Sequence, residues 1–182
     1  CTGSGCIACA LAKRVPEARV VATDLSAAAL ELARENARAL GAAVEFRPAD
    51  LLAGAAAESA DLVVSNPPYV ATAEIARLDR TVRDFEPALA LDGGPDGLQT
   101  ISRLVAEAVH VLNSGGMLMM EIGDDQADAV AEMLCRTTPL QFMGLRSDCA
   151  GRARVALASR RARAASLGAK RRRPKARTSP AR

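Results

Sequence analysis

The alternation of short, strand-like apolar runs with helix-forming segments constrains the fold of this 182-residue chain more than any other feature. Short apolar runs rich in β-branched residues occupy residues 19–24, 43–50 and 60–66, which predicts buried strands. After the first run, Ser26 stands at a helix N-cap position, and the helix-forming segment behind it stops at Gly41. Strands that alternate with helices are joined by crossovers, so the pattern predicts an α/β fold with a mainly parallel sheet and helices on both faces.

The second half of the chain continues this alternation. It predicts a helix over residues 98–112, a turn at 114–116, a strand over 117–122, a helix over 129–135, and a last pair of strands over 140–146 and 153–159. Only 2% of the residues are aromatic, so Ala, Leu and Val must fill the core. His110 is expected on the surface of its amphipathic helix, and Cys135 and Cys149 are expected to be small buried apolar residues.

Charge divides the chain into two parts. All 21 acidic residues lie at or before Asp148, whereas ten of the 24 Lys and Arg residues lie in residues 160–182. We therefore expect a folded body over residues 1–159 and a basic, disordered tail over residues 160–182. The acidic body argues against a broad nucleic-acid-binding surface. The tail could make a weak contact with RNA or the ribosome, but the favoured interpretation is a solvated appendage without a role of its own. No apolar run is long enough to span a bilayer and no secretory signal pattern opens the chain, so we expect a cytoplasmic protein that does not bind membranes. We also expect a monomer.

The first ten residues, CTGSGCIACA, allow two chemistries. Cys1, Cys6 and Cys9 have the spacing of the first three ligands of a plant-type iron–sulfur site. No fourth cysteine follows at a suitable distance, however, and Cys6 and Cys9 fall in the first turns of a predicted helix. We therefore expect no metal, and expect these two cysteines to pack that helix against the sheet.

The same stretch also forms a small-residue turn before a helix. Its glycines allow close backbone approach to a ligand, and the helix N-terminus offers unpaired N–H groups to a carboxylate. Asp24 ends the next predicted strand, where a carboxylate could accept both hydroxyls of a ribose. Asp24 could equally belong to the N-cap region of the following helix. Together the features suggest a nucleoside-bearing cofactor; the turn comprises Thr2, Gly3, Ser4 and Gly5.

Asn66, Pro67, Pro68 and Tyr69 follow another predicted strand and indicate the reaction. Ligands of open α/β sheets bind outside the carboxyl ends of the strands, which places this turn beside the glycine turn. Asn66 and a neighbouring main-chain carbonyl can accept the two hydrogens of a planar amino group, while the prolines stiffen the turn. Tyr69 offers a π face to a flat group. Holding an amide nitrogen in this way, aimed at a methyl sulfonium, favours S-adenosylmethionine over nicotinamide as the cofactor.

At this point the sequence resembles the class I S-adenosylmethionine-dependent methyltransferases, and more narrowly the glutamine methyltransferases of peptide-chain release factors (the HemK/PrmC family). The motifs TGSGCIA, TDLSAAALELARENA, NPPYV, FEPALALDGGPDGL, MEIGDDQ and AGRARVALA occur in that family's order over residues 1–158. The resemblance implies a Rossmann-like fold and a substrate glutamine within a GGQ motif. It also implies that residues 2–5 bind the methionine part of the cofactor, that Asp24 binds the ribose, and that Asp50 and Leu51 bind the adenine.

The resemblance further implies a strand before Cys1 that ends in an acidic residue and lies in the middle of the sheet. We therefore expect the chain to be an N-terminally truncated catalytic domain in which the strands at 19–24 and 60–66 do not pair. The competing functions are methylation of a ribosomal-protein glutamine, methylation of an amino group in a nucleic acid, and iron–sulfur electron transfer. An inactive fragment is a further alternative.

Overall fold

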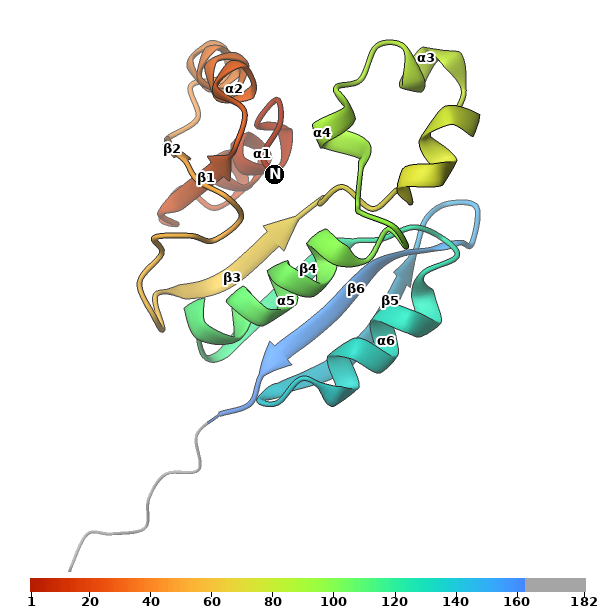
Figure 1. Ribbon diagram of the computed structural model, residues 1–182. Helices are drawn as coiled ribbons and strands as arrows, with labels where there is room; N and C mark the ends of the chain where they lie inside the picture. The colour runs from red at the N-terminus through yellow and green to blue at the C-terminus, as the bar shows by residue number, and fades with distance from the viewer. Residues whose placement is uncertain (163–182) are drawn as a thin grey trace, which may run out of the picture.

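The computed structural model describes residues 1–162, in which helices and strands follow the predicted order (Figure 1). Residues 163–182, which contain most of the predicted basic tail, lie outside the described part. The N-terminal elements are α1 (Cys6–Arg14), β1 (Val20–Asp24), α2 (Ala27–Leu40), β2 (Val44–Pro48) and β3 (Ala60–Ser65). A connecting segment holds the 3₁₀ helix η1 (Thr72–Arg77) and the short helices α3 (Arg80–Arg83) and α4 (Ala88–Leu91). The C-terminal elements are α5 (Gln99–Val111), β4 (Leu112–Glu121), α6 (Ala127–Arg136), β5 (Leu140–Ser147) and β6 (Ala153–Arg160).

The described strands form two sheets. β1 and β2 pair in parallel, and the second sheet has the order β3-β4-β6-β5. β3 and β4 are parallel, with Ser65 opposite Met120, so the carboxyl ends of these two strands meet at one edge. β6 runs antiparallel to both of its neighbours. As predicted, β1 and β3 are not paired with each other within residues 1–162.

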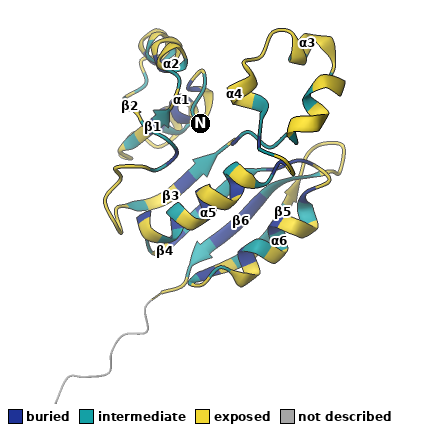
Figure 2. Ribbon diagram, viewed as in Figure 1, coloured by how far each residue is buried: buried dark blue, intermediate teal, exposed yellow. Residues whose placement is uncertain are grey.

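The main core lies between the four-stranded sheet and helices α5 and α6, which cover one of its faces (Figures 1 and 2). Aliphatic side chains and alanines fill it, as the low aromatic content predicts, and His110 is exposed as expected. The fully buried side chains include Ile101, Leu104, Leu118, Met120, Ile122, Val130, Leu134, Ala156 and Ala158.

The smaller N-terminal lobe consists of α1 and α2 packed on β1 and β2. The predicted ends of α2 are confirmed. The Ser26 hydroxyl accepts a hydrogen bond from the Ala29 N–H (3.2 Å), and Gly41 ends the helix with a left-handed φ of 61°. These two caps fix where the chain leaves β1 and where it returns to β2.

Most strand boundaries shift from their predicted positions, and the changes at β4 and β6 have a clear structural cause. Residues 114–116 belong to β4 rather than to a turn, because Ala60 already pairs with Leu112 and a bulge absorbs the shift in register. β6 extends to Arg160, one residue beyond the predicted end of the folded body. The Arg160 guanidinium donates a hydrogen bond to the Leu112 carbonyl and pairs with Glu58, which explains why this residue is held in the sheet.

The prediction that Cys135 and Cys149 are buried is wrong, since both are exposed. The buried side of α6 carries Val130 and Leu134, and Cys135 follows directly on the solvent side, whereas Cys149 lies in the β5–β6 turn. Cys9 is buried as expected, but Cys6 is exposed. None of the helices in residues 1–162 has both the length and the apolar character that crossing a membrane requires.

Candidate active site

The glycine turn lies against the carboxyl end of β1. The Thr2 N–H donates to the Thr23 carbonyl (2.9 Å), and the Gly5 N–H donates to the Thr2 carbonyl (2.9 Å). Gly5 has a left-handed φ of 78°, and a Cβ on it would stand 3.0 Å from the Ala33 Cβ. Glycine therefore lets α1 begin close against α2. No side chain caps α1, and its first turn carries no acidic residue, so the helix N-terminus suits an anionic ligand group.

Asp24 connects this turn to β1 and α2. One carboxylate oxygen accepts from the Gly3 N–H and the other from the Ser26 N–H, both at 2.9 Å. Each carboxylate oxygen can accept a second hydrogen bond, so the side chain can still bind a pair of hydroxyls. Asp24 thus orders the start of α2 and remains able to bind a ligand. The two roles that the sequence left open for it, in the N-cap region and in ligand binding, are therefore compatible.

Asp50 and Leu51 lie beside the end of β1. The Thr23 hydroxyl donates to the Leu51 carbonyl (2.8 Å), and Leu51 is buried with an unusual φ of 51°. Two side chains of α5 hold this loop. Arg103 bonds to the Asp50 carboxylate (2.6 Å), and Glu107 accepts from the Leu52 N–H (2.9 Å). The sequence did not single out these α5 residues, because their partners lie more than fifty positions away.

The four predicted catalytic residues follow β3 directly. Pro67 is fully buried, Pro68 is partly buried, and Asn66 is exposed. Within residues 1–162 the Asn66 side chain makes no hydrogen bond, which leaves its amide for a ligand. The Tyr69 hydroxyl donates to a Glu121 carboxylate oxygen at the end of β4 (3.3 Å). Partial burial and the nearby Glu121 carboxylate raise the pKa of Tyr69, so its phenol stays protonated at neutral pH.

The segment DGGPDG packs against the backbone of the same loop. The Val70 N–H donates to the Leu91 carbonyl (2.9 Å), and the Gly93 N–H donates back to the Val70 carbonyl (2.8 Å). A Cβ on Gly93 would lie 2.8 Å from the Tyr69 Cα and 2.9 Å from the Pro68 carbonyl oxygen. Glycine is thus required there by the close approach of two main chains. Hydrogen bonds from Thr72 and Gly94 hold the pKa of the Asp92 carboxyl below its ordinary value.

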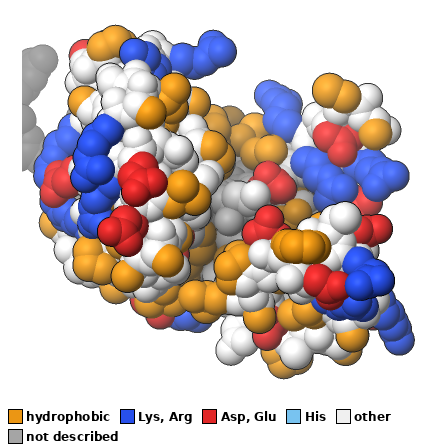
Figure 3. Space-filling model, turned by 90° about the horizontal axis from the view of Figure 1, so that it is seen from above, with side chains coloured by type: hydrophobic (Ala, Val, Ile, Leu, Met, Phe, Trp, Pro, Cys, Tyr) orange, Lys and Arg blue, Asp and Glu red, His pale blue; other side chains and the backbone are white. Residues whose placement is uncertain are grey.

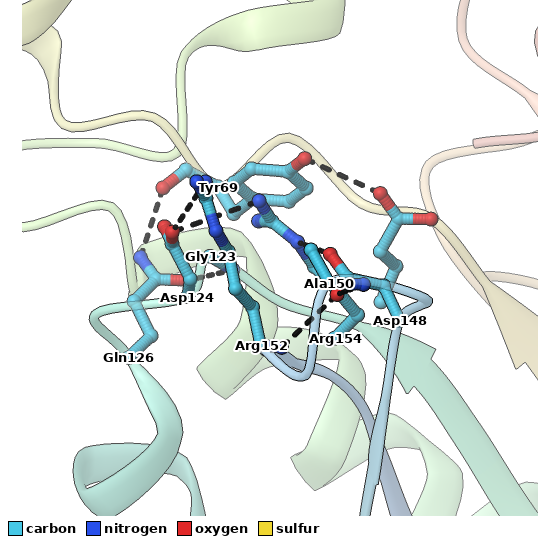
Figure 4. A network of polar contacts seen from close by, with 9 residues as sticks. Tyr69, Gly123, Asp124, Gln126, Asp148, Ala150, Arg152 and Arg154 are labelled. Atoms are coloured by element: carbon cyan, nitrogen blue, oxygen red, sulfur yellow. Dashed lines mark hydrogen bonds and ion pairs between the residues drawn. The ribbon is translucent and has the colours of Figure 1, made fainter.

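A polar network joins Tyr69 to the β4–α6 turn and the β5–β6 hairpin (Figure 4). Gln126 donates to the Tyr69 carbonyl (2.9 Å). Asp124 pairs with Arg152 and Arg154, and Arg154 also pairs with Asp148 in the hairpin. This network was not predicted, although the motif MEIGDDQ contains four of its members, Glu121, Gly123, Asp124 and Gln126.

The glycine turn and the Asn66–Tyr69 loop belong to two lobes with a hollow between them. Seen from above, the surface is hollowed between the N-terminal lobe and the segment carrying α3 and α4, and acidic side chains lie along the hollow (Figure 3). No hydrogen bond within the described residues joins the two loops directly. Residues 1–162 also contain no group of three His, Cys, Asp or Glu side chains that could hold a metal ion.

A glycine turn and Asp24 meet at the end of β1, and an Asn-Pro-Pro-Tyr loop follows β3, an arrangement typical of Rossmann-like methyltransferases. The sequence profile of the methyltransferase small domain family matches residues 1–93, and the chain belongs to that family. The fold agrees: a ribosomal protein L11 methylase from Lactobacillus delbrueckii subsp. bulgaricus superposes with a TM-score of 0.62 at 22% identity, covering 88% of this chain and 67% of that one.

Two further proteins are similar to this chain, and both methylate translation release or termination factors. The chain is 47% identical over 162 residues to a release factor glutamine methyltransferase from Moorella thermoacetica, covering 88% of this chain and 57% of that relative. The E. cuniculi Mtq2–Trm112 complex, which methylates the eRF1 translation termination factor, superposes with a TM-score of 0.56 at 25% identity, covering 88% of this chain and 81% of that one. The resemblance to release-factor glutamine methyltransferases is confirmed, and the chain spans little more than half the length of the Moorella relative.

Proposed function

We propose that the chain methylates the side-chain amide nitrogen of a glutamine in a peptide-chain release factor, with S-adenosylmethionine as the methyl donor. The observation that supports this most directly is the exposed, unbonded Asn66 amide, which follows β3 directly and precedes a buried proline and, three positions on, an anchored tyrosine. A release factor as the substrate is in keeping with the cytoplasmic location expected from the sequence.

The residues at the end of β1 fit the proposed cofactor. The uncapped N-terminus of α1 suits the methionine carboxylate, and Asp24 suits the ribose hydroxyls. The buried Leu51, fixed through its carbonyl by Thr23, suits the apolar face of an adenine, with Asp50 beside it. When bound, S-adenosylmethionine supplies an electrophilic methyl group on a sulfonium.

Asn66 and the loop carbonyls supply the acceptors that an amide substrate needs. An amide nitrogen is a weak nucleophile because its lone pair is delocalised into the carbonyl. The Asn66 side-chain oxygen and a neighbouring main-chain carbonyl, that of Ser65 or Pro67, can each accept one N–H of the glutamine amide, which orients the nitrogen and stabilises positive charge that develops on it. The half-buried Tyr69 ring offers a flat surface beside that amide.

Replacement of Asn66 tests the proposal. Asn66→Ala should reduce methyl transfer to a release factor by about 100-fold or more, while the Kd for S-adenosylmethionine stays near the wild-type value. Asn113→Ala is the matched control, because Asn113 lies at the opposite end of the same sheet, where it bonds Asp61 (2.7 Å). Near-normal transfer by Asn66→Ala would overturn the assignment. Transfer to a ribosomal protein or a nucleic acid instead would support one of the competing substrates.

A further inference from the structure

Gln126 stands apart from every other polar side chain in the described part of the chain. It is 7% exposed, which makes it the only buried polar or charged residue within residues 1–162, and it occupies the N-cap position of α6. A buried amide that lacked partners would be costly, so its hydrogen bonds indicate what the residue does.

The Gln126 amide makes three hydrogen bonds, each to a main-chain group of a different segment. Its Nε2 donates to the Tyr69 carbonyl (2.9 Å) and to the Gly97 carbonyl (3.2 Å). Its Oε1 accepts from the Gly123 N–H (2.9 Å). One side chain therefore joins the loop after β3, the loop before α5 and the turn after β4.

Tyr69 is consequently held at both ends, by the last residue of β4 and by the turn that follows it. Its carbonyl accepts from Gln126, and its hydroxyl donates to Glu121. Figure 4 shows the Tyr69 side chain extended away from the carbonyl that Gln126 contacts. With its two ends fixed, the residue has little freedom to rotate or to shift along the sheet edge. The acceptors of Asn66 and Pro67, three and two positions earlier, are then fixed in direction as well.

We propose that Gln126 is a positioning residue, which aims the acceptors of the Asn66–Tyr69 loop at the substrate amide without contacting substrate or cofactor. The proposal rests on the proposed function for the identity of the substrate. The claim that Gln126 holds the Asn66–Tyr69 loop in place depends only on its three hydrogen bonds. Loss of the Gln126 amide should release Tyr69, and with it the loop, while the cofactor-binding residues of the N-terminal lobe keep their contacts.

The test compares Gln126→Ala and Gln126→Glu with the matched control Gln141→Ala, in which an exposed glutamine of β5 is truncated. We expect kcat for release-factor methylation to fall about 100-fold in Gln126→Ala, because the loop would no longer hold the substrate amide in the reactive position. The Kd for S-adenosylmethionine should be unchanged. Glutamate keeps the acceptor for Gly123 but, when ionised, opposes two carbonyl oxygens. The kcat of Gln126→Glu should therefore recover as the pH falls and the carboxyl becomes protonated, a dependence that Gln126→Ala should lack.

Amide hydrogen exchange tests the same inference without any turnover. The N–H groups of Val70, Thr72 and Gly93, which connect the two loops, should lose protection in Gln126→Ala and keep it in Gln141→Ala. Wild-type kcat with unchanged exchange in Gln126→Ala would overturn the inference. So would a loss of cofactor binding and stability in proportion to kcat, since this would make Gln126 merely structural. If the wild-type protein transfers no methyl group, the proposed function fails, and the exchange of these amides still decides whether Gln126 holds the loop.

Discussion

Gly97 offers the sharpest test of how the candidate active-site loop is held. Its φ is 73°, in the left-handed region, and a Cβ there would overlap the Tyr69 carbonyl oxygen and lie 2.7 Å from the Gln126 Nε2. Gly97→Ala should therefore carry two costs. The left-handed backbone costs an alanine about 1–2 kcal/mol. Displacement of the buried hydrogen bond between Gln126 and Tyr69 should add about 1–3 kcal/mol.

Gly54→Ala separates these two costs. Gly54 has a similar φ of 77°, but a Cβ there would meet no atom within 4 Å. This variant should lose only the backbone contribution of about 1–2 kcal/mol. The difference between the two variants then measures the displaced hydrogen bond.

Urea unfolding followed by circular dichroism gives the free energy of unfolding of each variant. We expect Gly97→Ala to be less stable than Gly54→Ala by about 1–3 kcal/mol, a substantial part of the 5–15 kcal/mol typical of a folded domain. We also expect Gly97→Ala to impair methyl transfer more strongly than S-adenosylmethionine binding. Equal free energies within about 0.5 kcal/mol would refute the close packing of Gly97 on the Tyr69 carbonyl.

Two further predictions concern single side chains. Tyr69 is the only tyrosine and the chain has no tryptophan, so an ultraviolet absorbance titration should follow this group alone and give a midpoint above the ordinary pKa of 10.0. Because the pKa of Tyr69 is raised in the folded state, its contribution to the free energy of unfolding should be present in full below pH 10 and decline as the pH rises through the folded midpoint. A midpoint at or below 10.0 would contradict the burial of Tyr69 beside Glu121. Alkylation followed by mass spectrometry should modify the exposed Cys6, Cys135 and Cys149 in the folded protein and Cys9 only on unfolding, and rapid modification of Cys9 would contradict the packing of α1.

The parts of the fold that depend on local chemistry were predicted from the sequence. The cap residues Ser26 and Gly41 mark both ends of α2, since capping involves only neighbouring backbone groups. The β-branched runs mark β1 and β3 for the same reason. The loop after β3 was identified because Asn66 and Tyr69 have no structural purpose in a simple proline turn.

The errors and omissions depend on long-range packing. The strand pairing of Leu112 with Ala60 turned a predicted turn at residues 114–116 into strand, and the orientation of α6 left Cys135 in solvent. Neither the register between strands nor the rotation of a helix about its axis follows from hydrophobic periodicity to within one residue. Gln126 was missed for the same reason, because its three partners lie up to 57 positions away.

Three of the motifs that carry the family resemblance meet at one main-chain group, the Tyr69 carbonyl. The motif NPPY supplies that carbonyl, MEIGDDQ supplies the Gln126 amide that bonds it, and DGGPDG supplies Gly97, on which a Cβ would overlap it. A change in any one motif therefore alters the position of the same loop. Under the proposed function, MEIGDDQ and DGGPDG support the loop that binds the substrate, and direct contact with the substrate is required only of NPPY.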